Sequence, residues 1–158
     1  MRDVRADPRQ GATEKRDGRN REATLRFYEA INRHDVDAVG GCLAQDNVAH
    51  CLPEELGQTR EEYLRFVQTA FEAFPDFHFE LLDVIAEGDR VAARFRNTGT
   101  HEAEFMGIPA SGRPINVEGS DFFRFDDDAR ITAHWSHADN LQFMQQLGVM
   151  PGQSATPG

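Results

Sequence analysis

Apolar residues recur every three or four positions in the first half of the chain, which is the spacing of one helix face. This pattern predicts a helix over 21–33, a short second helix after Asp35, and a third helix between Thr59 and Pro75. Asp35 suits the N-cap of the second helix. Thr59 stands three residues before a glutamate, as in a capping box. The segment 47–52, between the second and third helices, is expected to be a short strand or an extended loop.

Beyond Pro75 the apolar residues alternate with polar ones, which is typical of strands with one buried face. Four strands are expected, over residues 77–87, 90–100, 115–125 and 130–139, and a short helix is expected over 140–148. Helices followed by a run of antiparallel strands indicate an α+β fold. We expect a curved, mostly antiparallel sheet that wraps around the helices as a cone and leaves an internal pocket.

The 158-residue chain suits a single domain, which we place at residues 21–150. A domain of this size can bury roughly 70% of the surface that its unfolded chain exposes. Residues 1–20 are polar and charged and hold few large apolar side chains, so this segment is predicted to be disordered. The same prediction applies to the tail, residues 151–158.

The formal net charge of −10 argues against nucleic acid and anionic membranes as partners. No apolar run approaches the roughly 18 residues of a membrane span, and the first residues do not resemble a secretory signal. Cys42 and Cys51 match no metal or redox motif, so they are expected to be free thiols in the cytoplasm. Sixteen arginines against one lysine suggest a GC-rich genome, as in actinobacteria.

Asp121 stands out because it lies in line with the apolar residues of its strand. Alternate residues share a face, so Val117, Asp121, Phe123 and Phe125 are expected on one side. An acid in this place is either a core carboxylate partnered by a histidine or a backbone group, or a proton carrier. Desolvation disfavours a charged carboxylate and raises its pKa toward neutrality, which suits an acid–base catalyst. The sequence leaves both interpretations open.

The last hairpin offers partners for this acid. If Phe125 pairs with Ile131, Asp121 faces Trp135 across the two strands. The residues then expected on the pocket face are Asp121, Trp135, His137 and Asp139. On this register His137 assists Asp121 as an acid–base partner. Asp139 ends the strand, where it either assists as well or caps the final helix.

Other histidines and aromatic residues are candidates for contact with a ligand. His134 and His137 fall on opposite faces of a strand, so a shared metal is not expected, and His134 is assigned to the surface or an interface. His101, next to the loop 104–114, either gates the pocket or lies on the surface. The aromatic residues that are expected to stack on a flat ligand, or else to pack as plain core, are Trp135, Phe27, Phe66 and Phe71.

No glycine-rich phosphate loop, nucleophile elbow or Cys/His zinc pattern occurs in the sequence. No metal and no cofactor are therefore expected. Removing one proton from a carbon between two carbonyls is a reaction that needs neither. A carboxylate, a proton donor and a shaped cavity suffice for such a reaction.

A series of short motifs in a fixed order runs through the second half of the chain. They are Phe74–Asp76, Gly88–Val91, Gly99–His101, Phe105–Pro109 with Gly112–Arg113, Phe123–Phe125, and His134–Trp135 with Asp139. Together they resemble the SnoaL-like polyketide cyclase family, and the likeness covers nearly all of residues 21–150. The resemblance implies the cone-shaped α+β barrel shared with scytalone dehydratase and ketosteroid isomerase. By the same analogy, His50 lies near the mouth of the cone, where it contacts substrate or makes a structural bond.

The resemblance also implies an activity: a cofactor-independent enzyme of aromatic polyketide biosynthesis, as in antibiotic pathways, that closes a ring by intramolecular aldol condensation. Two departures stand near the expected site. Family members often carry an aspartate directly after His-Trp, where this chain has Ser136, and the turn 126–130 is one residue longer than usual. Certain relatives are thought to hydroxylate aromatic polyketides without a cofactor, so a hydroxylase is the second interpretation.

A third interpretation is a binding or dimerisation module without catalysis, in which side chains would fill the cone. A homodimer is expected in any case, because open sheets of this kind commonly pack face to face. The outer face of the predicted sheet carries Phe122 among alternating polar residues.

Overall fold

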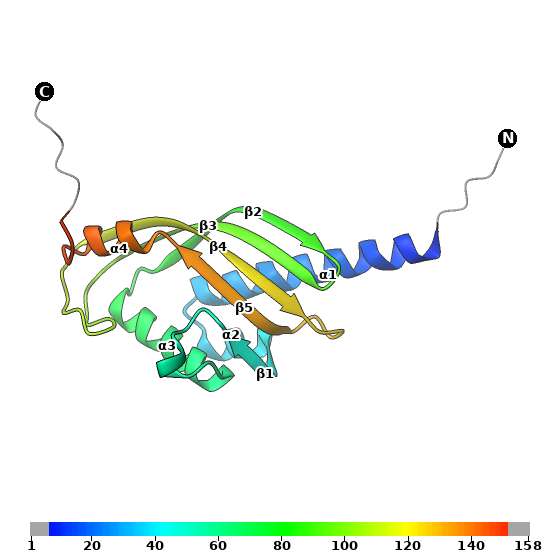
Figure 1. Ribbon diagram of the computed structural model, residues 1–158, viewed down its shortest axis with the longest axis horizontal. Helices are drawn as coiled ribbons and strands as arrows, with labels where there is room; N and C mark the ends of the chain where they lie inside the picture. The colour runs from blue at the N-terminus through cyan, green and yellow to red at the C-terminus, as the bar shows by residue number, and fades with distance from the viewer. Residues whose placement is uncertain (1–6, 152–158) are drawn as a thin grey trace, which may run out of the picture.

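The computed structural model describes residues 7–151, which form a five-stranded sheet with helices against its inner face (Figure 1). The strands lie in the order β1-β5-β4-β3-β2, and neighbours are antiparallel except for the parallel pair β1 and β5. Their bounds are Leu43–Ala49 for β1, His78–Glu87 for β2, Arg90–Thr100 for β3, Pro114–Phe125 for β4 and Ile131–Ala138 for β5. The α+β class and the mostly antiparallel sheet are confirmed.

Four α-helices within residues 7–151 accompany the sheet: α1 Pro8–Asn32, α2 Val36–Cys42, α3 Arg60–Ala73 and α4 Asn140–Gln146. A single 3-10 turn, Glu54–Leu56, precedes α3. The predicted caps are confirmed. The Asp35 side chain accepts from the Ala38 N–H, and Thr59 and Glu62 form both bonds of the capping box. Helix α3 ends two residues before Pro75, which has no N–H to continue the helix.

Helix α1 begins at Pro8, so the prediction of disorder is wrong for residues 8–20. Polar bonds hold this part of the helix against the β2–β3 turn. The Asn20 side chain donates to the Gly88 carbonyl oxygen at 2.9 Å, and the Asp17 carboxylate accepts from the Gly88 N–H at 2.7 Å. The sequence shows few apolar residues here because hydrogen bonds, rather than apolar burial, anchor the segment. The other predictions of disorder fall on residues 1–6 and 152–158, which lie outside the described residues.

The hairpin of β4 and β5 has a different register from the one predicted. Phe125 pairs with Ile131 as expected, but Arg124 pairs with Ala133, so Thr132 is an extra residue on β5. This is a β-bulge, and the Thr132 hydroxyl donates to the Arg124 carbonyl oxygen at 3.2 Å. A one-residue shift exchanges the two faces of a strand from that point onward. Asp121 therefore faces Ser136 across the hairpin, and the predicted pairing with Trp135 is wrong.

The predicted inner face of β4 is confirmed, since Val117, Asp121, Phe123 and Phe125 are all buried. Phe123 packs edge-on against Phe27 of α1, with ring centroids 5.5 Å apart. A second cluster under the β3–β4 loop joins α3 and α4 and includes Phe74, Phe105 and Leu147. The two clusters close the sheet around its helices and leave a hollow between them.

No helix within residues 7–151 combines the length and the apolar character that crossing a bilayer requires.

Candidate active site

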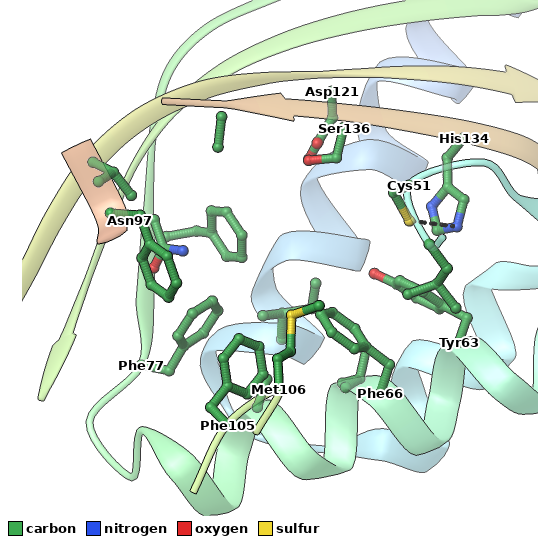
Figure 2. A pocket seen from close by; sticks show the side chains of 18 of the residues that line it. Cys51, Tyr63, Phe66, Phe77, Asn97, Phe105, Met106, Asp121, His134 and Ser136 are labelled. Carbon is green, nitrogen blue, oxygen red and sulfur yellow. Dashed lines mark hydrogen bonds between the residues drawn. The ribbon is translucent and has the colours of Figure 1, made fainter. Parts of the chain in front are cut away.

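A cavity of about 370 Å³ lies between the inner face of the sheet and helix α3 (Figure 2). Small-molecule sites in proteins commonly fall between 300 and 1,000 Å³. Its wall is mainly apolar, and the phenylalanines that line it are Phe27, Phe66, Phe71, Phe77, Phe79, Phe105 and Phe143. Such a wall excludes water and offers flat surfaces to an aromatic ligand.

Asp121 projects from β4 into this cavity, as Figure 2 shows. Its residue surface is only 7% exposed, and the Tyr28 hydroxyl donates a hydrogen bond to its Oδ2 atom. Desolvation raises the pKa of Asp121 to about 6, while hydrogen bonds from Ser136 and Tyr28 and the charge of His137 oppose that rise. Both protonation states are therefore accessible near neutral pH, with roughly a tenth of the carboxyl protonated at pH 7.

His134, on β5, lies in the cavity wall beside Asp121's partner Ser136. Burial lowers the pKa of His134 to about 4, with a smaller contribution from the charge of His50, so the imidazole is neutral at physiological pH. Its Nε2 atom lies 3.7 Å from the Cys51 sulfur. Burial also raises the pKa of Cys51 to about 12, so the thiol stays protonated and is a poor nucleophile.

Asn97, on β3, supplies a polar group at the other end of the cavity in Figure 2. Its Oδ1 atom is buried without a hydrogen-bond partner among the described residues. An unpaired buried oxygen of this kind costs free energy unless a ligand or water satisfies it. The cavity thus offers polar groups at separate points of a largely apolar wall.

Of the residues that the sequence nominated, Asp121, Phe27, Phe66 and Phe71 line the cavity. The placement of Trp135 and His137 on the pocket face is wrong, because the bulge at Thr132 turns both side chains to the outer face. The surface assignment of His134 is wrong for the same reason, since this residue is buried in the wall.

The three remaining candidates lie outside the cavity wall. Asp139 caps α4 by accepting from the Gln142 N–H at 3.0 Å, which is the alternative that the sequence left open for it. His50 stacks on Trp135, with ring centroids 4.8 Å apart. His101 is fully buried, accepts from the Ser111 N–H through Nδ1 at 3.2 Å and stacks on Phe74, so its expected place on the surface is wrong.

Sequence reasoning missed His134, Ser136, Tyr63, Cys51 and Asn97 as wall residues. The first two follow from the bulge, for which Thr132 gives no local sign. Tyr63 fits the apolar pattern of the third helix, so the sequence predicts only a core position for it.

Among residues 7–151, no three His, Cys, Asp or Glu side chains come together in a group that could hold a metal ion.

Comparisons with known proteins agree on the fold and the family. The model of the SnoaL-like polyketide cyclase family matches residues 22–147. Wild-type IdmH of Streptomyces antibioticus, provisionally assigned as a polyketide cyclase, is 34% identical with a TM-score of 0.70, and the match covers 82% of this chain and 98% of IdmH. A comparison with curated proteins found no match.

Two further solved structures share 26% identity and a TM-score of 0.76 with this chain. TsrD of Streptomyces laurentii is covered over 97% of its length and 84% of this chain. AclR of Streptomyces galilaeus, provisionally assigned as a hydroxylase, is covered over 85% of its length and 86% of this chain. With the family model matching most of its length, this chain belongs to the SnoaL-like polyketide cyclase family.

Proposed function

We propose that this protein closes a ring in an aromatic polyketide intermediate by an intramolecular aldol reaction, without a cofactor. The observation that carries the proposal is the Asp121 carboxyl, buried in an apolar cavity with a pKa of about 6. A general base is most effective when its pKa lies near the working pH. Family membership supports this class of chemistry but does not fix the substrate.

In the proposed reaction, the Asp121 carboxylate takes a proton from a carbon between two carbonyl groups. The electron pair of the broken C–H bond delocalises as an enolate. The enolate carbon then attacks a second carbonyl carbon of the same molecule and forms the new C–C bond. The resulting alkoxide gains a proton, Asp121 releases the proton that it removed, and the product has the same composition as the substrate until water is lost. The aromatic wall holds the two reacting ends together.

The experiment that tests the proposal compares Asp121→Asn with the wild type. Cells that produce a linear aromatic polyketide would express either protein, and chromatography with mass spectrometry would follow isomers of unchanged mass. Loss of a general base reduces rates by about 100- to 10,000-fold, so the cyclised isomer should disappear with Asp121→Asn. Asp139→Asn is the matched control, because it makes the same acid-to-amide change outside the cavity and asparagine also caps helices well. Equal activity of wild type and Asp121→Asn would refute the assignment.

A hydroxylase is the second candidate, and Ser136 is the observation that favours it. A serine stands opposite Asp121 where family members often carry an acid, and AclR is among the similar structures. In this reaction the substrate enolate adds to O₂ to give a hydroperoxide. A reductant such as a thiol then supplies two electrons, one oxygen stays in the product as a hydroxyl, and the other leaves as water. Oxygen consumption and a product heavier by one oxygen atom would favour this candidate over cyclisation.

A non-catalytic module fits the structure less well. That interpretation expects a cone filled by side chains, whereas the cavity of about 370 Å³ has room for a ligand. The raised pKa of Asp121 also supports a role in proton transfer over a purely structural one.

We also propose that the protein forms a homodimer through the outer face of the sheet. Phe122 is 48% exposed on the outer face of the sheet, and Trp135 and His137 lie on the same face. Aromatic side chains on an open sheet face are typical of surfaces that pair with a second copy.

A further inference from the structure

Two buried tyrosines approach the cavity from different helices, and their hydroxyl groups have different surroundings. Tyr28, on α1, is 2% exposed, and its hydroxyl donates to Asp121. Tyr63, on α3, is 8% exposed, and its hydroxyl forms no hydrogen bond with another described residue. Figure 2 shows this hydroxyl pointing into the cavity. A hydroxyl in this position is available to donate to a ligand that enters the cavity.

Tyr63 is held firmly in this orientation. It lies in the first turns of α3, directly after the capping box that Thr59 and Glu62 form. Its ring packs edge-on against His134, with centroids 4.4 Å apart. A donor that is fixed before the substrate arrives needs no reorganisation when charge develops on that substrate.

The protonation state of Tyr63 suits a hydrogen-bond donor. Desolvation raises its pKa well above the usual value, and the charges of Cys51 and Asp121 add to the rise. The hydroxyl therefore keeps its proton at neutral pH. Tyr63 and Asp121 line the same cavity, so one bound molecule can contact both.

The other side-chain donors in the wall differ from Tyr63 in their surroundings. No arginine or lysine is among the described residues that line the cavity. Ser136 lies opposite Asp121 and lowers the pKa of that carboxyl, and His134 and Cys51 contact each other. Asn97 lies at the other end of the cavity in Figure 2. Asn140, at the start of α4, also lines the cavity, but Tyr63 is the hydroxyl donor that Figure 2 shows pointing into it.

We propose that Tyr63 is a second catalytic residue, whose hydroxyl donates a hydrogen bond to the substrate ketone oxygen that gains negative charge as Asp121 removes a proton. This inference rests on the proposed function. The proton passes from the carbon next to the ketone to the Asp121 carboxylate, and the electron pair of that bond moves toward the ketone oxygen. Tyr63 stabilises the oxyanion without giving up its own proton. The site is thus built for an enolisable ketone, and it recognises the enolate form.

Two probes test the inference, and both are small bicyclic molecules. The first is 2-naphthol, an aromatic mimic of an enolised ketone, whose binding is followed by its fluorescence. The second is 2-tetralone, whose C1 protons exchange with deuterium in D₂O when a base enolises the ketone, as NMR detects. Tyr63→Phe is the test variant and Tyr28→Phe the matched control, since each removes one buried hydroxyl. Circular dichroism verifies that both variants are folded.

Tyr63→Phe should weaken 2-naphthol binding roughly 10-fold, because one hydrogen bond to the probe is lost. It should slow catalysed exchange of 2-tetralone by about 100-fold, which is typical for loss of an oxyanion donor. The pH midpoint of the exchange rate should not move, because Tyr63 does not bond to Asp121. Tyr28→Phe should instead raise that midpoint, because the hydroxyl that it removes lowers the pKa of Asp121.

The possible failures are distinguishable. If Tyr63→Phe binds 2-naphthol as the wild type does, or if the wild type does not bind it, the inference is overturned. The inference also fails if Tyr63→Phe exchanges 2-tetralone at the wild-type rate, or merely shifts the pH midpoint as Tyr28→Phe does. If wild type and Asp121→Asn exchange 2-tetralone equally slowly, the proposed function fails, and the catalytic role of Tyr63 fails with it. Weaker 2-naphthol binding by Tyr63→Phe would then support only the hydrogen bond to a ligand.

Discussion

The two faces of the β4–β5 hairpin consist of alternate residues of the same strands, yet they differ in their chemistry. The inner face carries Asp121, His134 and Ser136, and the outer face carries Phe122, Trp135 and His137. On the inner face the exclusion of water moves the pKa of a carboxyl up to about 6 and that of an imidazole down to about 4. On the outer face, partly exposed ion pairs such as Arg96 with Glu118 contribute little to stability.

This contrast teaches that the residue type alone does not make an ionisable group catalytic. His134 and His137 lie three residues apart, and only the face that each occupies separates a buried imidazole in the cavity wall from one on the outer face. One extra residue, Thr132, decides which face that is.

An insertion of one alanine after Thr132 should have the largest effect. It would shift the rest of β5 by a further residue, which places Trp135 opposite Asp121 and turns His134 outward. We expect a loss of on the order of 4 kcal/mol or more in the free energy of unfolding, and binding of 2-naphthol should disappear. Urea denaturation and fluorescence would measure the two effects.

Deletion of Thr132 is the matched control for that insertion. Without the extra residue, Ala133 can still pair with Arg124, so His134 and Ser136 keep their face. The loss should be about 1 kcal/mol, from the bond between Thr132 and the Arg124 carbonyl. A deletion as damaging as the insertion would contradict the role given to the bulge.

The stability of the inner face should depend on pH in two opposite ways. Asp121 has a folded pKa raised from 3.8 to about 6, so its contribution to stability is complete below pH 3.8 and is lost as pH rises to 6. His134 has a folded pKa lowered from 6.5 to about 4, so its contribution is complete above pH 6.5 and is lost as pH falls to 4. Each amounts to about 3 kcal/mol, and the two nearly cancel between pH 4 and 6.5.

Single substitutions should separate the contribution of Asp121 to the pH dependence of stability from that of His134. Relative to the wild type, the free energy of unfolding of Asp121→Asn should rise with pH between 4 and 6, because only His134 still titrates. That of His134→Gln should fall with pH over the same window, because only Asp121 remains. Urea denaturation at pH 4, 5, 6 and 7 measures both slopes, and parallel curves for the three proteins would contradict the burial of these charges.

Substitutions on the outer face should leave catalysis nearly unchanged. His137→Gln should alter the exchange of 2-tetralone less than about threefold. It should raise the pH midpoint slightly, because the charge of His137 lowers the pKa of Asp121. A loss like that of Asp121→Asn would show that His137 works in the site after all.

Phe122→Glu tests the second copy on this face. A buried, unpaired charge is costly, so the substitution should convert a dimer into a folded monomer. Sedimentation velocity would detect the change, and a wild type that sediments as a monomer would refute the proposed homodimer.

Local rules predicted the elements well, and their limits lie in particular residues. Caps at Asp35 and Thr59 follow from side chains that bond to the next turn, and the inner face of β4 follows from alternation. The register of β5 does not follow from such rules, because the bulge at Thr132 is marked only by a hydrogen bond to the Arg124 carbonyl oxygen, which leaves no pattern in the sequence. The start of α1 was not predicted for a related reason, since hydrogen bonds from Asn20 and Asp17 to the backbone of Gly88 help to hold this segment.

In the site, the sequence singled out Asp121 because a charge interrupted an apolar run. It gave no such signal for Tyr63, whose ring satisfies the apolar pattern of α3 while its hydroxyl reaches the cavity. In the sequence, an amphipathic side chain of this kind fits the pattern of a core residue. In the folded structure its polar end can still face a cavity.

The early turns of α1 run past the edge of the sheet in Figure 1 and are bonded to the β2–β3 turn through Asn20 and to the β4–β5 turn through Arg16 and Arg19. At 1.5 Å per residue, the stretch from Pro8 to Asn20 is a rod of about 20 Å. A spin label or fluorophore at Arg9 would therefore sit on a rigid helical extension, away from the ligand cavity. Its distance to a second probe on the barrel should stay narrowly distributed, which makes this helix a convenient ruler for the molecule.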